Sequence, residues 1–561
     1  MSQVHQLIAT FKCFLKRLPS VATQGYLFPL NVHQRRLHSD PSKVFFPLDI
    51  KGREFFGNSF QVGTGIDYLV GLYDLPEPMP SRFEERPFHV PVEILPGQVM
   101  THTTVLQPRD RDAFLPVARD VGTHLPDLRI GNQDHVFAAR PRRFVYLKVP
   151  SGTEVTVAPR RGKRVFVGEP IDCENDNEPK VPRVLCLFVD GLSSMFMHGT
   201  SFDAVMPHTA EFFFSGTHFT DFATSAEWTL PSMSSLFTAK YPHNHRIIDP
   251  RGETLLDTNQ KILSEYFQSA GYLCSQFGSN WRMTPAHGYA RGFDRTLYSR
   301  EESAPWMINE YLEFLEAFPE RSHFSWLTLF GLHQPWPKRV PQISVQTKAT
   351  NEYLLREPYG DQKSVKPGRD PNRIQAYTEA LRQMDRALGR IYDFVNRSDG
   401  KQEWLITLVA DHGQSYFSDE PSYLADQRTR VPWLIRGPGV PQLSSREMVE
   451  TVDILPTLLR AAGLSEALNL MDGRVPAALG GDEPRKYSFT ESLFPSQPYV
   501  CRFRDGRDWL EITSSVATGD RGEVSPTTLR VSAASSSGYV GGICDAELLD
   551  VAKRLIKDAG T

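Results

Sequence analysis

The residues best suited to chemistry stand directly after long apolar runs of the sequence. Asp190 follows one such run, and Asp411 and His412 follow another. Taken singly, an Asp or a His in such a position is often only a turn former or a helix cap. Two carboxylates and an imidazole together suit Zn²⁺ or Mn²⁺, whereas a pure Ca²⁺ site favours oxygen ligands alone. The pattern predicts a divalent metal, with Zn or Mn expected first and Ca or Mg as alternatives.

A third apolar run, at 323–330, is followed after two residues by His333. Alone, this histidine is more simply explained as a turn residue. Open parallel sheets, however, bind ligands outside the carboxyl ends of their strands. If the three runs are neighbouring strands, His333 and the three residues named above converge on one edge of the sheet.

Thr229 begins a stretch, LPSMSSLFTA after it, that is typical of a short helix with Pro231 in its first turn. The first turn of a helix exposes backbone N–H groups and favours an anion. A hydroxyl placed there and bound to a metal can act as an alkoxide-like nucleophile. The plain alternative is that Thr229 only caps the helix.

The elements that must position these residues alternate along the chain. Apolar runs at 183–189, 323–330 and 403–410 are expected to be strands covered on both faces. Apolar residues spaced by three and four predict amphipathic helices at 259–271 and 373–396. Strands alternating with helices predict an α/β fold with a doubly wound, mostly parallel sheet.

The composition and hydrophobic pattern of the sequence change several times along the chain, which predicts several domains and segments. Short β-branched runs separated by turn residues predict a β-rich, sandwich-like domain before the α/β part, and a Ser/Thr/Gly/Ala-rich stretch predicts a loose surface segment near the end. The expected parts are a tail (1–45), a β-rich accessory domain (46–175), the α/β catalytic domain (182–515, with 440–515 as its smaller C-terminal part), and a low-complexity segment with a closing amphipathic helix (516–561).

Composition excludes some classes of partner. With 62 Lys and Arg against 66 Asp and Glu, the net charge of −4 is unlike that of a protein that binds nucleic acid through a basic face. No apolar run is long enough to span a membrane, and the N-terminus lacks the pattern of a signal peptide, so we expect a cytoplasmic protein. The six scattered Cys are expected to be free thiols. The oligomeric state is not predicted.

These residues lie in motifs that resemble the sulfatase branch of the alkaline phosphatase superfamily. That family's signature helix runs Cys, Ser or Thr, any residue, Pro, Ser, Arg, and closes with Tyr-Pro; here it stands as TLPSMSSLFTAKYPHNH (229–245). The resemblance covers about residues 182–512. Further segments match in the expected order: FVDG (188–191), RGFD (291–294), ADHG (410–413), TRVPWLIRGPG (429–439), VDILPTLLRAAGL (452–464), MDGR (471–474) and FRDGRDWLEI (503–512).

The resemblance implies a role for each matching position. The metal ligands would be Asp190, Thr229, Asp411 and His412, with Thr229 also the nucleophile. His333 would contact the transferred group or protonate the leaving group. Further anion-binding positions would be Asn280, Arg282, His287 and Arg430, of which Arg430 could instead be structural.

Two departures from the family pattern bear on the reaction. Sulfatases convert a Cys, or rarely a Ser, to formylglycine at the nucleophile position, and Thr229 cannot undergo that conversion. Met233 stands where the family keeps an Arg. An unmodified Thr with an Asp-His pair resembles the phosphate-handling relatives: phosphodiesterases, phosphonate monoester hydrolases, and phosphoethanolamine or phosphoglycerol transferases.

We therefore expect a metal-dependent hydrolase or transferase that acts on phosphate mono- or diesters through Thr229. The substrate would be a small-molecule, glycan or lipid-linked ester. One alternative is a sulfuric ester hydrolase that uses an unmodified Thr. Another is a non-catalytic, sulfatase-like protein that binds a glycan or an anion.

Overall fold

The computed structural model describes most of the chain in two compact units. The units are residues 1–173 with 297–300, and residues 174–296 with 301–561. The residues described are 59–61, 65–73, 91–119, 127–135, 143–159, 164–175, 179–196, 200–248, 256–278, 280, 285, 288–299, 302–332, 368–397, 403–417, 419, 422–464, 470–519 and 521–558.

The first unit is built from antiparallel strands in two sheets. One sheet contains β1 (Ser59–Gln61), β2 (Asp67–Leu72), β3 (Val92–Met100), β5 (Ala113–Arg119), β8 (Val145–Val149), β10 (Val165–Gly168) and β11 (Ile171–Asp172). The other runs β4 (Thr104–Leu106), β9 (Val155–Ala158), β6 (Asp127–Ile130) and β7 (Gln133–His135). Buried Val and Leu side chains of both sheets form one cluster, which confirms the sandwich-like, β-rich prediction.

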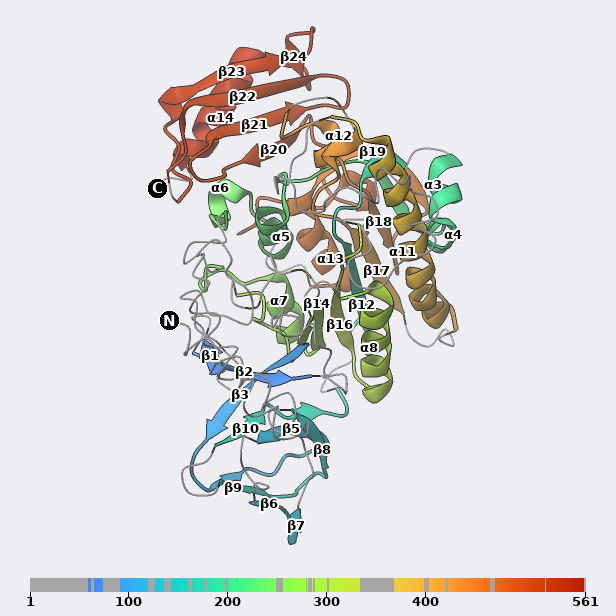
Figure 1. The fold of residues 1–561 in the computed structure, drawn as a ribbon, viewed down its shortest axis with the longest axis vertical. Coiled ribbons are helices and arrows are strands. Elements are labelled where there is room, and N and C mark those ends of the chain that lie inside the picture. The colour runs from blue at the N-terminus through green and yellow to red at the C-terminus, as the bar shows by residue number, and fades with distance from the viewer. Residues whose placement is uncertain are drawn as a thin grey trace, which may run out of the picture. The chain divides into compact units, whose positions relative to one another are not determined.

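The second unit contains the predicted, mostly parallel sheet (Figure 1). Its described strands run in the order β14 (Leu273–Gly278), β16 (His323–Leu329), β12 (Arg183–Val189), β17 (Trp404–Val409), β18 (Trp433–Arg436), β13 (Thr217–Ala223) and β19 (Leu443–Glu450). The first four are parallel to one another, whereas β18 is antiparallel to both of its neighbours. The three apolar runs are therefore adjacent strands, as predicted. The short strand β15 (Arg295–Tyr298) is divided between the two units.

Helices cover both faces of this sheet, which is why its strands are apolar on both sides. On one face of β16, Phe324 stacks on a ring of α7 (Leu263–Ser269) and Trp326 packs at a tilt against a ring of α5 (Thr229–Thr238). On the opposite face, His323 contacts Phe314 of α8 (Ala304–Ala317). The helices are α3 (Thr200–Val205), α4 (Pro207–Phe213), α5 (Thr229–Thr238), α6 (Pro242–His245), α7 (Leu263–Ser269), α8 (Ala304–Ala317), α11 (Pro371–Arg397), α12 (Asp426–Thr429) and α13 (Ile454–Ala462). Short 3-10 turns are η2 (Ser194–Phe196), η5 (Ser415–Phe417), η6 (Thr451–Asp453), η8 (Ala477–Leu479) and η9 (Pro526–Thr528).

The C-terminal part is a second, antiparallel sheet with a helix packed on it (Figure 1). It contains β20 (Ser488–Ser492), β21 (Pro498–Arg504), β22 (Trp509–Ala517) and β23 (Leu529–Ala534), followed by β24 (Tyr539–Val540), β25 (Ile543–Cys544) and α14 (Asp545–Asp558). The closing helix is confirmed, but much of the predicted loose segment is ordered structure. In β23 only Leu529 is buried, so the polar composition reflects a strand that is exposed to solvent along most of its length.

Two other expectations concern cysteines and membrane spans. The five described cysteines are free thiols: Cys173, Cys186, Cys274, Cys501 and Cys544. Within the described ranges, every helix is too short or too polar to cross a bilayer.

Candidate metal and nucleophile site

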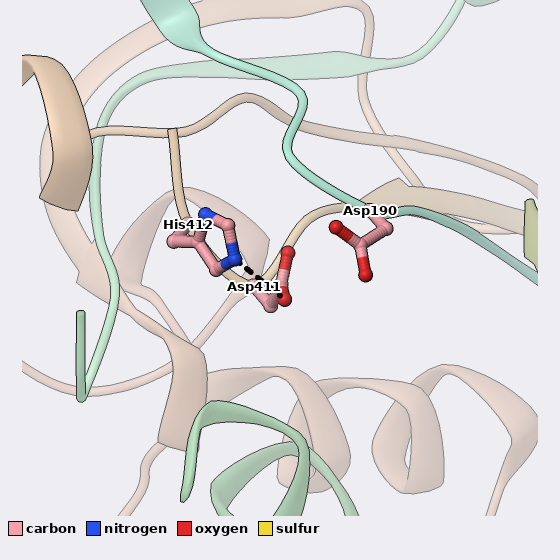
Figure 2. Close-up of side chains that lie close together, drawn as sticks. All are labelled: Asp190, Asp411 and His412. Atoms are coloured by element: carbon pink, nitrogen blue, oxygen red, sulfur yellow. Dashed lines mark ion pairs between the residues drawn. The ribbon is translucent and has the colours of Figure 1, made fainter. Parts of the chain in front are cut away.

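Asp190, Asp411 and His412 form a buried cluster at one edge of the central sheet (Figure 2). One ligand atom from each lies within 4.8 Å of the others. The register of the sheet explains this meeting, because β12 and β17 are adjacent and parallel and pair Phe188 with Val409. Asp190, which follows β12, and Asp411, which follows β17, therefore lie at the same carboxyl edge of the sheet. This is the convergence that the sequence predicted for these three side chains.

One oxygen of the Asp411 carboxylate accepts a hydrogen bond from the described protein, and the other does not. Its Oδ1 accepts a hydrogen bond from the backbone N–H of Gly191 at 3.1 Å. Its Oδ2 is buried and accepts no hydrogen bond from any described residue, although His412 Nε2 lies 3.3 Å away. A buried carboxylate oxygen without a hydrogen bond costs free energy unless a cation compensates it. The donor set and this oxygen both fit a divalent metal ion.

The backbone contact of His412 decides which of its nitrogens carries the proton. Nδ1 lies 2.8 Å from the carbonyl oxygen of Gly413, which can only accept, so Nδ1 donates. In the neutral imidazole Nε2 therefore presents a lone pair, and Nε2 lies 3.4 Å from Thr229 Oγ1. A backbone carbonyl that fixes the tautomer in this way is usual for a metal-binding imidazole.

Thr229 lies beside this cluster and does not act as a helix cap. The N-cap of α5 is Trp228, which makes no side-chain capping hydrogen bond, and Thr229 is the first helical residue. Its side chain is 4% exposed. The capping explanation for Thr229 therefore fails, and its hydroxyl is left facing His412 at the positive end of a ten-residue helix.

The rest of the signature stretch holds this helix in place. Ser232 Oγ donates to the carbonyl of Ala226 at 3.0 Å. His245, at the end of the stretch, lies with Nε2 3.1 Å from the Pro231 carbonyl and 3.2 Å from Ser235 Oγ. Burial lowers the pKa of His245 to about 3, so the ring is neutral and acts as a hydrogen-bonding brace.

The loop after Asp190 is fixed from a second direction. The hydroxyl of Tyr377, on α11, donates to the Gly191 carbonyl at 2.8 Å and accepts from the Ser193 N–H at 2.9 Å. Burial raises the pKa of Tyr377, so the phenol stays protonated and keeps both contacts. Gly191 has φ of 72°, a left-handed conformation that favours glycine.

Of the five remaining predicted site residues, the structure describes two. Asn280 lies in the site, where its side-chain amide donates to Asp190 Oδ2. Arg430 is instead engaged elsewhere: its guanidinium lies 3.3 Å from Asp221 and 3.7 Å from Asp426, which favours the structural alternative. Outside the described residues are His333, Arg282 and His287, so their roles stay predictions.

A feature that the sequence did not reveal is the 427–430 segment, which joins the loops around the site. Its backbone carbonyl groups accept hydrogen bonds from the backbone N–H groups of Ser194, Gly413 and Thr224 at 3.2, 2.6 and 2.8 Å. A Cβ added to Gly413 would lie 2.2 Å from the backbone carbonyl oxygen of Gln427, the first residue of this segment. Glycine is therefore required at position 413. The motif TRVPWLIRGPG begins inside the segment, but the motif alone does not indicate these contacts.

Comparisons with known proteins find relatives of the part of the chain that forms the central sheet. The Sulfatase family model matches residues 182–464, just over half of the chain. The protein named "Sulfatase" from Formosa agariphila is 23% identical over 375 residues, which are 52% of this chain and 73% of that protein. The "Extracellular sulfatase SULF-1 homolog" of Drosophila melanogaster is 24% identical over 319 residues, 46% of this chain and 28% of the fly protein.

Among solved structures, the phosphonate monoester hydrolase SpPMH from Silicibacter pomeroyi aligns with a TM-score of 0.49 and 19% identity, over 67% of this chain and 94% of that one. The family match itself begins just before β12 and runs to the end of α13. It therefore contains both strands that carry the cluster and the helix that begins with Thr229, and the chain belongs to the sulfatase family.

Proposed function

We propose that this member of the sulfatase family hydrolyses or transfers phosphate esters, with Thr229 as the nucleophile. The observation that carries the proposal is the position of Thr229 Oγ1, which is buried 3.4 Å from the lone-pair nitrogen of His412. A threonine cannot become formylglycine, so the hydroxyl itself must serve. Met233 supports this choice because it is fully buried and replaces the Arg that accompanies the modified residue in sulfatases.

The residues that would hold the divalent metal are Asp190, Asp411 and His412, together with Thr229. When bound, such an ion would neutralise the negative charge that develops on the oxygens around phosphorus. The N-terminal turn of α5 would add its N–H groups and dipole to the same charge. Asn280, which donates to Asp190, would keep that carboxylate in place.

The covalent step exchanges one P–O bond for another. Thr229 Oγ1 gives up its proton to solvent and bonds to phosphorus, while the bond from phosphorus to the leaving alcohol breaks and the alcohol oxygen takes up a proton. His333 is the predicted donor of that proton. Water, or the hydroxyl of an acceptor, then gives its proton to His333 as its oxygen attacks phosphorus, and the bond between phosphorus and Thr229 Oγ1 breaks to release Thr229. The proposed substrates are small-molecule, glycan or lipid-linked phosphate esters.

The family match favours one other activity, the hydrolysis of sulfate esters by the unmodified Thr229. A panel of aryl phosphate monoesters, aryl phosphate diesters and aryl sulfates separates the two activities. Each substrate is assayed with Zn²⁺, Mn²⁺, Mg²⁺ and Ca²⁺ added in turn. We expect turnover of the phosphate esters, and a clear preference for sulfate would replace the phosphate proposal with the sulfate one.

Thr229→Ala and Thr229→Ser test the nucleophile. The alanine variant is expected to lose turnover but to keep its fold, and the serine variant is expected to retain part of the activity because it keeps the hydroxyl. Unchanged turnover in Thr229→Ala would exclude the mechanism. No turnover of any ester by metal-loaded wild-type protein would favour the third alternative, a non-catalytic protein that binds a glycan or an anion.

A further inference from the structure

Arg428 is a buried cation beside the site that the proposed mechanism has not used. It lies in the 427–430 segment and is 4% exposed. Its Nε donates to the backbone carbonyl of Glu227 at 2.7 Å, two residues before Thr229. Its own carbonyl accepts from the Gly413 N–H at 2.6 Å, one residue after His412. The residue is therefore attached both to the loop of the nucleophile and to the loop of the metal ligands.

The outer part of this guanidinium has no protein partner among the described residues. No described side chain or carbonyl accepts a hydrogen bond from the two terminal nitrogens of Arg428, and no carboxylate lies within ion-pair distance. The side chain of Glu227 accepts a hydrogen bond from Ser492 Oγ at 2.6 Å through Oε1, and its Oε2 is buried without a hydrogen bond from any described residue. A buried guanidinium with one nitrogen anchored and two nitrogens open is arranged to receive a ligand with at least two acceptor oxygens.

The positive charge of Arg428 and its place beside the site indicate that this ligand would be an anion. Burial lowers the pKa of Arg428, while the charges of Glu227 and Asp411 act in the opposite direction; the guanidinium nevertheless stays protonated at neutral pH. Two described positions where a cation was considered do not supply one to the site: 233 is a methionine, and Arg430 is paired with Asp221. Arg428 is thus a buried, protonated side chain near both Asp411 and the Thr229 loop.

We propose that the terminal nitrogens of Arg428 bind the oxygens of the tetrahedral anion that Thr229 attacks. This inference rests on the proposed function and names the residue that recognises the transferred group. The hydrogen bond from Nε to the Glu227 carbonyl holds the guanidinium in place, so its two terminal nitrogens are already oriented when the substrate arrives. A phosphoryl group offers the oxygens that such a fork can hold in pairs.

The test measures binding of inorganic phosphate to the metal-loaded protein by calorimetry, with inorganic sulfate as a second probe. Arg428→Met removes the charge and keeps the bulk, and it is expected to weaken phosphate binding about 10- to 100-fold, the effect of losing hydrogen bonds to a charged group. Arg428→Lys keeps a charge but not the fork, and intermediate affinity is expected. Metal content is measured for each variant, and it is expected to equal that of the wild type.

Arg183→Met is the matched control. Arg183 is also buried at 4% exposure, and burial also lowers its pKa, but it begins β12 at the edge of the sheet opposite to Asp190. This variant is expected to lower the melting temperature and to leave phosphate affinity within about twofold of wild type, since it touches no site residue. An equal loss of affinity in both Met variants would mean that general destabilisation, not anion contact, explains the result for Arg428→Met.

Two results would overturn the inference: phosphate affinity in Arg428→Met within twofold of wild type, or no phosphate binding by the metal-loaded wild type. If Arg428→Met does not fold, unchanged affinity in Arg428→Lys overturns it equally. Failure of the proposed function is a different observation, because it would be a wild type that turns over no phosphate ester. Anion binding is measured without turnover, so the two failures are distinguishable.

Discussion

Two buried clusters of carboxylates in the second unit differ in how their charge is compensated. The site cluster contains Asp190 and Asp411 at the carboxyl edge of the sheet. The second, called here the Arg485 cluster, contains Glu450 and Asp453 with Tyr241 and Arg485. The carboxylates of both clusters are fully buried. The two clusters differ in which groups compensate this buried negative charge.

The Arg485 cluster is complete within the protein. Asp453 accepts from the backbone N–H groups of Glu450 and Arg474, both at 2.9 Å, and from the Arg485 guanidinium. Glu450 accepts from Tyr241 and from the Phe489 N–H, and it lies 3.5 Å from Arg485. Burial alone would lower the pKa of Arg485, but the two carboxylates outweigh it and raise that pKa. This cluster therefore has a structural role.

The site cluster is compensated only in part by described residues. Asp411 Oδ2 accepts no hydrogen bond from any of them, and the imidazole beside it, in the neutral form that a metal ligand requires, adds no positive charge. Buried charges are normally paired or bound to a metal. The Arg485 cluster therefore holds the fold together with its own residues, whereas the site cluster keeps a carboxylate oxygen that a divalent cation could compensate.

The largest expected effect is on turnover. Asp411→Asn removes one carboxylate charge from the site cluster and is expected to reduce kcat/KM for a phosphate ester by about 1,000-fold or more, the scale of losing several kcal/mol of charge stabilisation. Bound metal, measured by elemental analysis, is expected to fall in parallel. Turnover and metal content close to wild type would show that the carboxylate is not a ligand.

The Arg485 cluster should respond through stability. Arg485→Met leaves Glu450 and Asp453 buried without their cation, and removing one partner of a buried pair costs about 3–5 kcal/mol. Chemical denaturation monitored by fluorescence measures this loss, which is expected to be the same with and without added metal. A loss below about 1 kcal/mol would remove the contrast between the two clusters.

A third prediction concerns stability: most substitutions of buried residues destabilise a protein, but Asp411→Asn is expected not to do so when metal is absent. In the presence of a chelator, Asp411→Asn is expected to be at least as stable as the wild type, because it removes repulsion between two nearby carboxylates. With metal at 100 times its Kd, the wild type is expected to gain about 2.7 kcal/mol and the variant far less. Thermal unfolding under both conditions provides the comparison. A metal-independent loss of stability in Asp411→Asn would place the site cluster in the same class as the Arg485 cluster.

His323 sharpens the comparison because it is a buried group that remains uncharged. Burial, helped by the charge of Arg183, lowers its pKa from 6.5 to about 3, and Nε2 donates to the Phe318 carbonyl at 2.8 Å. A depressed pKa contributes stability that is fully present above pH 6.5 and is lost as the pH falls toward 3.

His323→Gln keeps a donor and removes this titration. Between pH 6.5 and 5 the wild type is expected to lose about 2 kcal/mol more than the variant, from 1.36 kcal/mol for each pH unit. Urea unfolding of both proteins at the two pH values measures the difference. Parallel pH profiles would contradict a neutral, buried His323.

The sheet and the ligand cluster could be predicted from the sequence because strands covered on both faces leave continuous apolar runs. Once the runs at 183–189 and 403–410 are neighbouring parallel strands, Asp190 and Asp411 must meet at one edge. A separate pattern, Pro231 in the first turn of an apolar stretch, predicted that Thr229 lies at a helix start, although it is the first helical residue and not the cap.

The rest depended on distant contacts that leave no local pattern. Arg428 and Arg430 look alike in the sequence, yet one is anchored to the Glu227 carbonyl and the other is paired with Asp221, about two hundred residues away. The C-terminal stretch appeared loose because β23 buries only Leu529. Neither the pairing of a buried charge nor the packing of a polar strand can be read from neighbouring residues.

The most direct test of the central claim is a crystal structure of the protein with Zn²⁺ or Mn²⁺, with the ion identified by anomalous scattering. The account predicts one ion bound by Asp190, Asp411 and His412, with Thr229 Oγ1 among its ligands at about 2.0–2.2 Å. An ion bound elsewhere, or a Thr229 hydroxyl turned away from an ion held by the other three, would contradict it.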